Sequence, residues 1–357
     1  MVKKDKIELL GIGISELEEF VTSLGEARFR GRQIHKWIYQ KDEDSFYAMS
    51  DLPKELRAKL DEVAIISFPK VLKQRVSKDG TRKYLLEFPD KKRVETVLIP
   101  QRNDNEKDIR YSLCLSTQVG CPVGCAFCAT GLNGFQRNLT AGEIVGEFLS
   151  SRRELKKKVK LKHEQPISNV VYMGMGEPMF NYDEVIKSIY ILNDHKGINI
   201  GQRSITISTS GDVKGIEKLA LENLQVTLAV SLHACDNELR DKLVPINRKY
   251  PLESLFKAVE FYIAQTNRRV TFEYVMLDDV NISRKDADNM IKLVKPLLAN
   301  VNLIPYNEVE GLPYQKPAKD KILQFYNWLV EGGLNVTIRE EKGADIEAAC
   351  GQLQAKR

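Results

Sequence analysis

Three closely spaced cysteines give this sequence its clearest chemical signal. Cys121, Cys125 and Cys128 follow the spacing C-x3-C-x2-C, and Phe127 comes directly before the last of them. Cysteine thiolates carried on one short loop can converge on a single metal centre. Because a cubane cluster has four irons, three protein ligands leave one iron free to bind and activate a substrate. The spacing therefore predicts a [4Fe-4S] cluster with an open coordination position.

Two simpler uses of these cysteines remain open. Structural zinc prefers four ligands, usually two pairs; Cys114 is a possible fourth ligand, but no second pair is near and the chain has only four histidines. A disulfide scaffold is typical of short, cysteine-rich secreted chains, whereas this chain has 6 cysteines in 357 residues and begins without an apolar leader. We therefore expect a reducing, cytoplasmic location, with Cys235 an ordinary free thiol.

Size and charge define the class of protein. A length of 357 residues allows two or three domains, and 43% hydrophobic with 29% charged residues is typical of a soluble globular chain. No apolar run of about 18 residues indicates a membrane span. The net charge of +5 permits a phosphate-bearing partner. Residues 152–162 carry seven positive charges and one negative charge, which fits either a solvated face or a nucleic-acid contact.

The elements that must position the cysteines begin with a helical region. Apolar residues recur at helical spacing over 14–24 and 29–39, and Gly25 ends the first run. Residues 50–53 predict the start of a third helix, with an N-cap and an early proline. The basic residues in 28–36 are available for nucleic-acid backbone, although a packing domain with a charged surface explains the pattern equally well.

The pattern then changes to strands. Residues 71–76 and 83–88 predict a hairpin with Asp79-Gly80 at its turn, and 93–100 predict another strand. Glu95 alternates with residues expected to be buried, so the pattern favours a solvent-facing side chain for it.

From residue 108 onward, strands alternate with helices. The predicted strands are 111–116, 169–174, 204–209, 226–231, 270–276 and 301–306, with a further short one at 335–339. Six strands that are each followed by a helix predict a parallel sheet with right-handed crossovers, closed or partly closed into an α/β barrel. The expected domains are a helical N-terminal domain (1–62), a β extension (63–107), the barrel (108–342) and a C-terminal segment (343–357).

Polar or glycine-rich motifs follow one predicted strand after another. They are Gly174–Pro178, Ser208–Gly211, Ser231–His233 and Asn307. The active site of a parallel barrel opens at the carboxyl ends of its strands, where the loops gather. Each motif alone is also explained by a tight turn, a helix cap or a core histidine. Their common position relative to the strands predicts one site, shared with the cysteine loop.

The cysteine loop and the strand-end motifs resemble the radical S-adenosylmethionine (SAM) superfamily. More narrowly, the chain resembles the RlmN-type RNA adenine-C2 methyltransferases over nearly its full length, in residues 29–34, 94–97, 114–128, 173–178, 208–211, 231–233, 302–307 and 345–353. The resemblance implies a partial (β/α)6 radical SAM barrel, preceded by a small helical domain that contacts RNA and by a β-hairpin extension.

The resemblance also implies roles for single residues. Cys121, Cys125 and Cys128 would hold the [4Fe-4S] cluster, whose open iron binds SAM. Glu95 matches a proton acceptor, against the solvent-facing interpretation above. Cys350 matches a cysteine that becomes methylated, and Cys114 the one that later forms a transient disulfide with it. The positions that match the SAM site are Gly176, Glu177, Ser208, Ser231, Leu232, His233 and Asn307.

The implied reaction uses two SAM molecules per turnover. C2 of adenine is too electron-poor to attack the SAM methyl group, whereas a thiolate can attack it, so Cys350 would be methylated first. A second SAM, cleaved at the cluster, would give a 5′-deoxyadenosyl radical that takes a hydrogen from the S-methyl group, and the resulting radical would add to C2. Glu95 would remove the C2 proton, and Cys114 would attack Cys350 to release the base.

The implied substrates are 23S rRNA at adenosine 2503 and tRNA at adenosine 37. A flavodoxin- or ferredoxin-type protein would supply electrons, and a monomer is expected. The segments 28–36 and 152–162 are candidates for phosphate contact. Three alternatives remain: a Cfr-type C8 methyltransferase, against which Pro178 counts; a radical SAM enzyme acting on proteins or small molecules; and a non-catalytic, zinc-bound RNA-binding protein.

Overall fold

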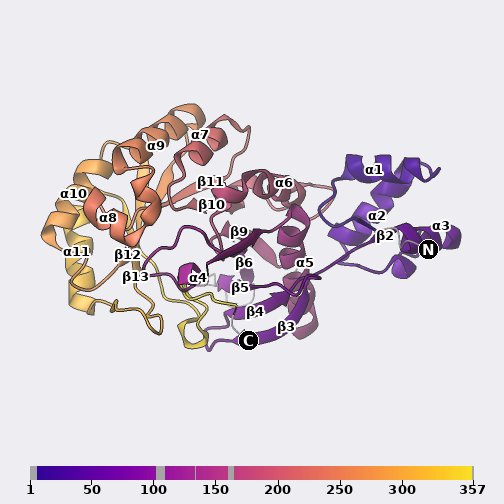
Figure 1. Ribbon diagram of the computed structural model, residues 1–357, viewed down its shortest axis with the longest axis horizontal. Coiled ribbons are helices and arrows are strands. Elements are labelled where there is room, and N and C mark those ends of the chain that lie inside the picture. The colour runs from indigo at the N-terminus through magenta and orange to yellow at the C-terminus, as the bar shows by residue number, and fades with distance from the viewer. Residues whose placement is uncertain (1–5, 102–108, 133, 160–164, 356–357) are drawn as a thin grey trace.

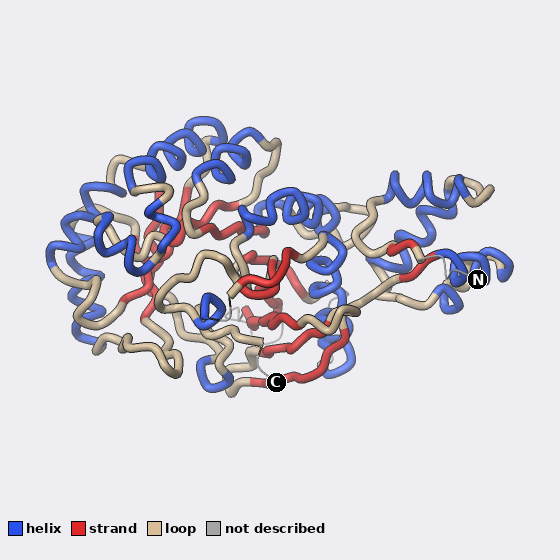
Figure 2. The backbone as a smooth tube through the Cα atoms, in the orientation of Figure 1, coloured by secondary structure: helices blue, strands red, loops and turns tan. Residues whose placement is uncertain are grey.

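One long sheet organises most of the chain. The computed structural model describes residues 6–101, 109–132, 134–159 and 165–355. Within these residues ten strands form one sheet in the order β14-β13-β12-β11-β10-β9-β6-β5-β4-β3. The strands from β6 to β14 run parallel, and those from β3 to β6 are antiparallel. Helices surround the outside of the parallel part (Figures 1 and 2).

The parallel part confirms the predicted partial barrel. Its strands are β6 (Arg110–Cys114), β9 (Ile167–Tyr172), β10 (Ile205–Thr209), β11 (Thr227–Ser231), β12 (Val270–Met276), β13 (Ala299–Pro305) and β14 (Val336–Ile338). The covering helices are α5 (Ala141–Lys158), α6 (Tyr182–Asn193), α7 (Val213–Leu221), α8 (Asn237–Leu243), α9 (Leu252–Thr266), α10 (Arg284–Val294) and α11 (Lys319–Glu331). Because β14 and β3 remain edges, the sheet does not close.

Sequence chemistry explains why these elements form. Strands covered on both faces are runs of apolar residues, as in Leu228–Val230 of β11, which is almost fully buried. The helix α5 begins at a capping box: Thr140 Oγ1 accepts from the Glu143 amide at 3.1 Å, and Glu143 accepts from the Thr140 amide at 2.9 Å. The two residues therefore cap the start of this helix reciprocally.

The predicted hairpin also forms and extends the barrel sheet. β3 (Lys70–Val76) and β4 (Arg82–Glu87) are antiparallel, and Asp79 Oδ1 accepts from the Thr81 amide at 2.7 Å in the turn between them. β5 (Arg93–Gln101) pairs with β4 on one side and with β6 on the other. The extension is thus continuous with the strands that end at the cysteine loop.

The N-terminal module projects from the side of the barrel (Figure 1). It contains β1 (Ile7–Glu8), α1 (Ile14–Ser23), α2 (Phe29–Tyr39), a short 3-10 turn (Phe46–Ala48), α3 (Lys54–Val63) and β2 (Ala64–Ile65). The N-cap expected in residues 50–53 is wrong in detail, since Pro53 itself precedes α3 and no side chain caps it. Asp51 instead accepts a hydrogen bond from the Trp37 indole at 2.5 Å.

Part of the basic run holds this module to the barrel. Asp42, which is 5% exposed, forms ion pairs with Arg152 at 2.5 Å and Lys156 at 2.9 Å, both on α5. Arg153 pairs with Asp44 at 2.9 Å and donates to the Asp42 carbonyl. Arg152 is buried in these contacts, which excludes it from phosphate contact, whereas for Arg153 and Lys156 that contact stays a prediction.

The rest of that run gives less information. Lys160 and Lys162 lie outside the described residues. None of the described helices combines the length and hydropathy that a membrane span requires.

Candidate active site

The carboxyl ends of the parallel strands open into a cavity that contains the cysteine triplet. The side chains or backbone of Cys121, Cys125, Cys128, Gly176, Glu177, Ser208, Ser231 and His233 line it, together with Glu273, Arg339 and Cys350. The structure thus brings together, in one space, residues from the loop after β6 and from the ends of β9, β10 and β11, as the strand-end argument predicted.

The cysteine loop is fixed by its backbone. It contains β7 (Gln118–Gly120), α4 (Ala129–Leu132) and β8 (Phe135–Asn138). The Ala126 amide donates to the carbonyl of Leu243 at the end of α8 at 3.0 Å. The Ala129 amide donates to the carbonyl of Gly351 at 2.7 Å, so the loop also binds the C-terminal tail.

The three thiols suit a cluster better than a single ion. Burial raises the pKa of Cys121 to about 12 and that of Cys125 well above its ordinary range, so thiolates here need a compensating cation such as iron. A structural zinc site uses four closed protein ligands. Three cysteines of one loop line this cavity, which is the ligand number of a cubane cluster with one open iron.

The wall opposite the cysteines is built around Glu177. Its Oε2 accepts hydrogen bonds from the Ser210 amide at 2.7 Å and the Ser210 hydroxyl at 2.6 Å, and its Oε1 accepts from the Met179 amide at 3.1 Å. Burial raises the pKa of this carboxyl. Gly176 has φ +106°, and a Cβ there would lie 2.7 Å from the Gln118 side chain, so only glycine fits.

His233 presents a neutral ring to the cavity. Burial lowers the pKa of His233 to about 3. Its Nδ1 accepts from the Val275 amide at 3.0 Å, which places the proton on Nε2 as a hydrogen-bond donor. The ring packs edge-on against Phe127, with centroids 4.8 Å apart, so this histidine also supports the cysteine loop.

Two of the predicted site residues do not line this cavity. Leu232 is fully buried, and its backbone donates to the Glu273 carbonyl at 2.9 Å. Asn307 lines the neighbouring cavity instead. Its Oδ1 is buried without a hydrogen-bond partner in the described part of the chain, which fits a ligand that is to be bound there.

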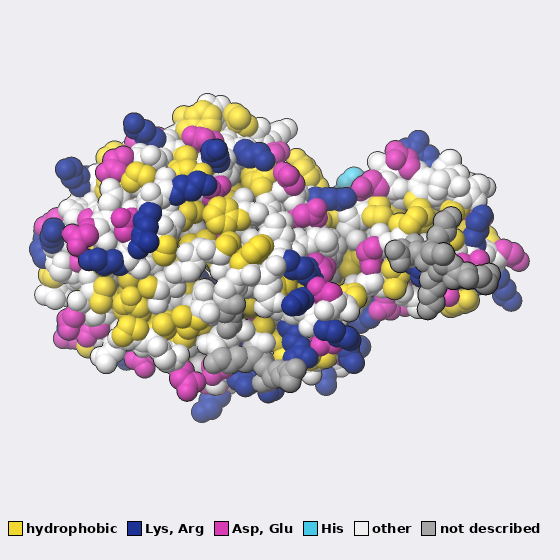
Figure 3. Space-filling view, viewed as in Figure 1, with side chains coloured by type: hydrophobic (Ala, Val, Ile, Leu, Met, Phe, Trp, Pro, Cys, Tyr) yellow, Lys and Arg dark blue, Asp and Glu magenta, His cyan; other side chains and the backbone are white. Residues whose placement is uncertain are grey.

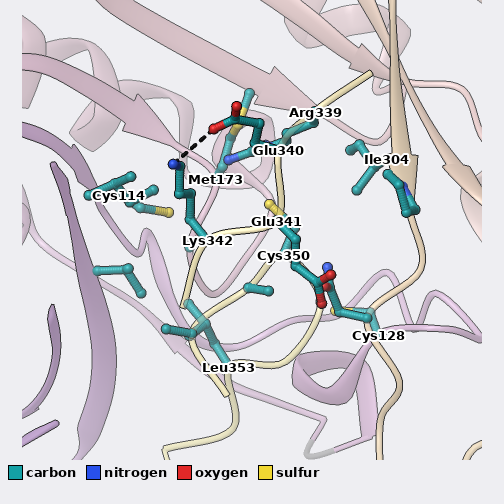
Figure 4. A pocket seen from close by; sticks show the side chains of 18 of the residues that line it. Cys114, Cys128, Met173, Ile304, Arg339, Glu340, Glu341, Lys342, Cys350 and Leu353 are labelled. Atoms are coloured by element: carbon teal, nitrogen blue, oxygen red, sulfur yellow. Dashed lines mark ion pairs between the residues drawn. The ribbon is translucent and has the colours of Figure 1, made fainter. Parts of the chain in front are cut away.

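The neighbouring cavity contains the other two predicted cysteines (Figure 4). Cys114, at the end of β6, and Cys350, on the C-terminal tail, both line it. Cys350 lines the first cavity as well, so it is one of the residues shared by the two cavities. Both thiols are free in this structure. Burial, and secondarily Cys350, raises the pKa of Cys114 to about 12.

Hydrogen bonds hold the tail in this position. Thr130 donates from its hydroxyl to the Leu353 carbonyl at 2.7 Å, and the side chain of Gln352 donates to the Glu308 carbonyl at 3.0 Å. At the start of the tail, the Gly343 amide donates to Asp79 in the hairpin turn at 2.9 Å. The hairpin and the cysteine loop therefore both position Cys350.

Glu95 is buried, so the solvent-facing interpretation of its strand is wrong. It is 6% exposed and forms an ion pair with Lys83 of β4 at 3.2 Å. Its Oε2 accepts from the Gln354 amide at 2.9 Å. Among the described residues, the linings of the two cavities do not include Glu95, but they do include Leu353, the tail residue next to its partner.

The chain closely resembles proteins of one family. Residues 7–66 match the family model described as the ribosomal RNA large subunit methyltransferase N-terminal domain, and residues 115–292 match the radical SAM superfamily. A probable dual-specificity RNA methyltransferase RlmN from Syntrophomonas wolfei is 66% identical over 351 residues, which cover 98% of each chain. The RlmN of Alcanivorax borkumensis is 45% identical over 99% of this chain and 91% of its own.

The chain belongs to the RlmN family. A crystal structure of a radical SAM methyltransferase from Sphaerobacter thermophilus agrees with the fold at a TM-score of 0.92, with 42% identity over 98% of this chain and 100% of that one. Membership of the radical SAM superfamily implies SAM and a [4Fe-4S] cluster, which the buried cysteine triplet fits.

Several residues of this RlmN-family site were not predicted from the sequence. Arg339 lines both cavities, and the nearby Cys350, then Glu273 and Cys114, raise its pKa. It directly follows β14, so the strand-end rule that selected Asn307 would have found it. No sequence pattern would have predicted that Lys83 is buried beside Glu95, because a lysine in a hairpin is usually exposed.

Proposed function

We propose that this protein is a radical SAM RNA methyltransferase that methylates C2 of adenine at adenosine 2503 of 23S rRNA and adenosine 37 of tRNA. The observation that carries the proposal is the position of Cys350. This residue lines both the cavity that contains the three proposed cluster cysteines and the cavity that contains Cys114. If a methyl group is taken from SAM in the first cavity and transferred to the base in the second, a residue that lines both cavities is needed to carry it.

The relatives support RNA as the substrate. The two relatives described above are named dual-specificity RNA methyltransferases, and both match nearly the whole chain. The N-terminal module matches a domain described for methyltransferases of large-subunit ribosomal RNA. We assign to this module a role in RNA contact. We also expect a monomeric cytoplasmic enzyme that receives electrons from a flavodoxin- or ferredoxin-type protein.

Cys121, Cys125 and Cys128 would hold the cluster, and the strand-end residues would hold SAM. When bound, cluster and SAM together supply a methyl group and, after reductive cleavage of a second SAM, a 5′-deoxyadenosyl radical. The Glu177 carboxyl and the His233 Nε2–H are hydrogen-bonding groups suited to the polar end of SAM. The residues proposed for SAM binding are Gly176, Glu177, Ser208, Ser231, Leu232, His233 and Asn307.

The remaining proposed roles belong to side chains of this protein. Cys350 accepts the methyl group as its thiolate, and Arg339 lines the same two cavities as this cysteine. Once the radical adduct has lost one electron, which the cluster would take up when bound, Glu95 removes the proton from C2. Cys114 then attacks the Cys350 sulfur to form a disulfide, the bond between that sulfur and the transferred carbon breaks, and the carbon takes up a proton to become the methyl group. Gln354, one partner of Glu95, belongs to the tail, so movement of the tail with the substrate would remove that contact and leave the carboxylate paired with Lys83.

The product of the reaction tests this proposal. Unmodified 23S rRNA and tRNA fragments are incubated under anaerobic conditions with the reconstituted protein, SAM and a reductant, and the digested nucleosides are identified by mass spectrometry against synthetic standards. The proposal predicts 2-methyladenosine. Detection of 8-methyladenosine would instead indicate Cfr-type chemistry, and a colourless zinc protein that binds RNA without methylating it would indicate a non-catalytic binder. Modification of neither RNA would contradict the proposal and leave protein or small molecules as substrates.

A further inference from the structure

A fully buried arginine under the first cavity has no role in the reaction proposed above. Arg240 lies on α8 and is 0% exposed. Its Nη2 donates to the carbonyls of Ser210 at 2.7 Å and Ser231 at 3.0 Å, and its Nε donates to the carbonyl of Leu232 at 3.0 Å. Its Nη1 donates to Oδ1 of Asn247 at 3.0 Å.

Three of these acceptors belong to the loops that leave β10 and β11. Ser210 is the residue whose amide and hydroxyl hold Glu177, and Ser231 lines the cavity directly. Carbonyls at the ends of two strands diverge from the sheet and lose their ladder partners. A buried carbonyl without a donor is costly, and one guanidinium satisfies three of them at once. Arg240 therefore fixes the distance between two neighbouring walls of the cavity.

The same helix also supports the cysteine loop. The Leu243 carbonyl at the end of α8 accepts the Ala126 amide, between two of the cluster cysteines. Leu243 and Val244 belong to the same apolar cluster as Val123 and Phe127 of that loop. Through α8, the strand ends and the cysteine loop are therefore joined by a single rigid turn of helix.

Within the described residues, no carboxylate is hydrogen-bonded to Arg240. Its four hydrogen-bond acceptors there are neutral oxygens, three carbonyls and one amide. Burial lowers the pKa of Arg240 to about 10, so the side chain stays positive at neutral pH. The end of its helix contacts the cysteine loop at Ala126, the residue after Cys125. A buried cation on this helix would stabilise negative charge on a cluster held by that loop.

We propose that Arg240 is a positioning residue that sets the spacing of the SAM-binding strand ends and supplies the fixed positive charge that favours the reduced cluster. Reduction adds one electron to the cluster, and an adjacent cation lowers the free energy of the more negative state. The inference rests on the radical SAM chemistry of the proposed function, but it does not depend on which RNA or which adenine carbon is methylated.

The test compares two variants of Arg240 with a matched control. R240Q removes the charge and keeps some hydrogen bonding, whereas R240K keeps the charge and has fewer donors. The control is R152Q, because Arg152 is also buried and also bound to backbone and side-chain oxygens, but on α5 and away from the cavity. The full-length proteins are reconstituted without oxygen, and iron content, the midpoint potential by EPR-monitored titration, and the Kd for SAM are measured.

We expect R240Q to shift the redox equilibrium about tenfold toward the oxidised cluster, which lowers the potential by about 59 mV for a one-electron couple. R240K should keep a potential close to wild type and bind SAM about tenfold more weakly. R152Q should lose stability with an unchanged potential and SAM affinity. Wild-type potential and SAM affinity in both Arg240 variants would overturn the proposal. If R240Q does not fold, the R240K variant provides the test. A wild-type SAM affinity in R240K would then overturn the proposal. A wild-type protein that holds no iron would refute the proposed function itself.

Discussion

The Thr96 hydroxyl has one hydrogen but two oxygen neighbours in the structure. These are the Cys114 carbonyl at 2.9 Å and Oε2 of Glu147 at 2.6 Å. If Thr96 donates to the carbonyl, Glu147 must donate to Thr96, which requires a protonated carboxyl. Burial, which is complete for Glu147, raises its pKa well above the ordinary value and favours the same state. Both observations favour a protonated Glu147 behind Cys114.

The stability of an E147Q variant tests this protonation. Since the folded pKa of Glu147 is raised, its contribution is fully present below the ordinary pKa of 4.5 and is lost as pH rises toward the folded value. The amide of glutamine does not titrate. We expect E147Q to be about 1 kcal/mol less stable than wild type at low pH, from one lost hydrogen bond. This difference should shrink or reverse as pH rises above 4.5 in denaturant unfolding. A constant difference across pH would contradict a protonated Glu147.

Single residues of the site could be predicted from the sequence where spacing carries the information. The cysteine triplet was predictable from its spacing along the chain. The strand-end motifs were predictable because the carboxyl ends of parallel strands all lie at the same end of the barrel. The burial of Glu95 was not predictable, because alternation of polar and apolar residues indicates which side chains are exposed only in a strand with one solvated face. β5 is covered on both faces and has buried residues at consecutive positions. Arg240 was not predictable either, since it lies in a helix that is polar in sequence.

At the scale of elements, the β3–β4 hairpin contacts both the C-terminal tail and Glu95. Lys83 of β4 is 5% exposed, pairs with Glu95 and donates to the Glu347 carbonyl of the tail at 2.8 Å. Asp79 in the turn accepts from Gly343 at the start of the tail. The hairpin could be predicted from its turn residues, but its contact with the tail could not, because residues hundreds of positions apart share no local pattern.

A double-mutant cycle on this pair tests the role of the hairpin. K83M removes the cation and leaves Glu95 buried without its partner, which typically costs about 3–5 kcal/mol. E95Q alone should cost less, because a neutral amide needs no counter-charge. We expect the double variant K83M/E95Q to recover at least about 1 kcal/mol relative to the sum of the two single variants, measured by urea unfolding. Additive losses would show that the two side chains are not coupled.

At the scale of the whole molecule, Asp42 joins the N-terminal module to the barrel. Its carboxylate is buried between Arg152 and Lys156 of α5. D42N should therefore destabilise the protein by about 3–5 kcal/mol, because Arg152 stays buried without its counter-charge. The matched variant D44N breaks a more exposed pair with Arg153 and should cost under about 1 kcal/mol. Equal losses in thermal unfolding would contradict this account of the junction.

The surface that contacts RNA is a further property of the whole molecule. Figure 3 shows Lys and Arg side chains over both the barrel and the N-terminal module, with a dense group near their junction. Lys157 and Lys158 at the end of α5 remain exposed after Arg152, Arg153 and Lys156 are used internally. Composition predicted the basic run, but only the fold separates its structural members from those that face solvent.

Charge reversal tests the exposed pair. K157E/K158E should make the slope of log Kobs against log salt for RNA binding less steep by about 1–2. Each phosphate contact that is lost means that about one counterion fewer is released when the RNA binds. Thermal stability should change little, since the ion pair between Lys157 and Glu154 is exposed. A wild-type salt slope in a folded double variant would exclude these lysines from the RNA surface.

Cys350 is the proposed carrier of the methyl carbon between the two cavities. Methylation of Cys350 itself is the most direct test of this role. The anaerobically reconstituted protein is incubated with SAM labelled in the methyl group, without RNA, and its peptides are analysed by mass spectrometry. We predict one labelled methyl group on Cys350, no label in C350A, and normal labelling in C235A, which removes a buried thiol outside both cavities. RNA added afterwards should receive the labelled carbon. A C350A protein that still methylates RNA would contradict the account.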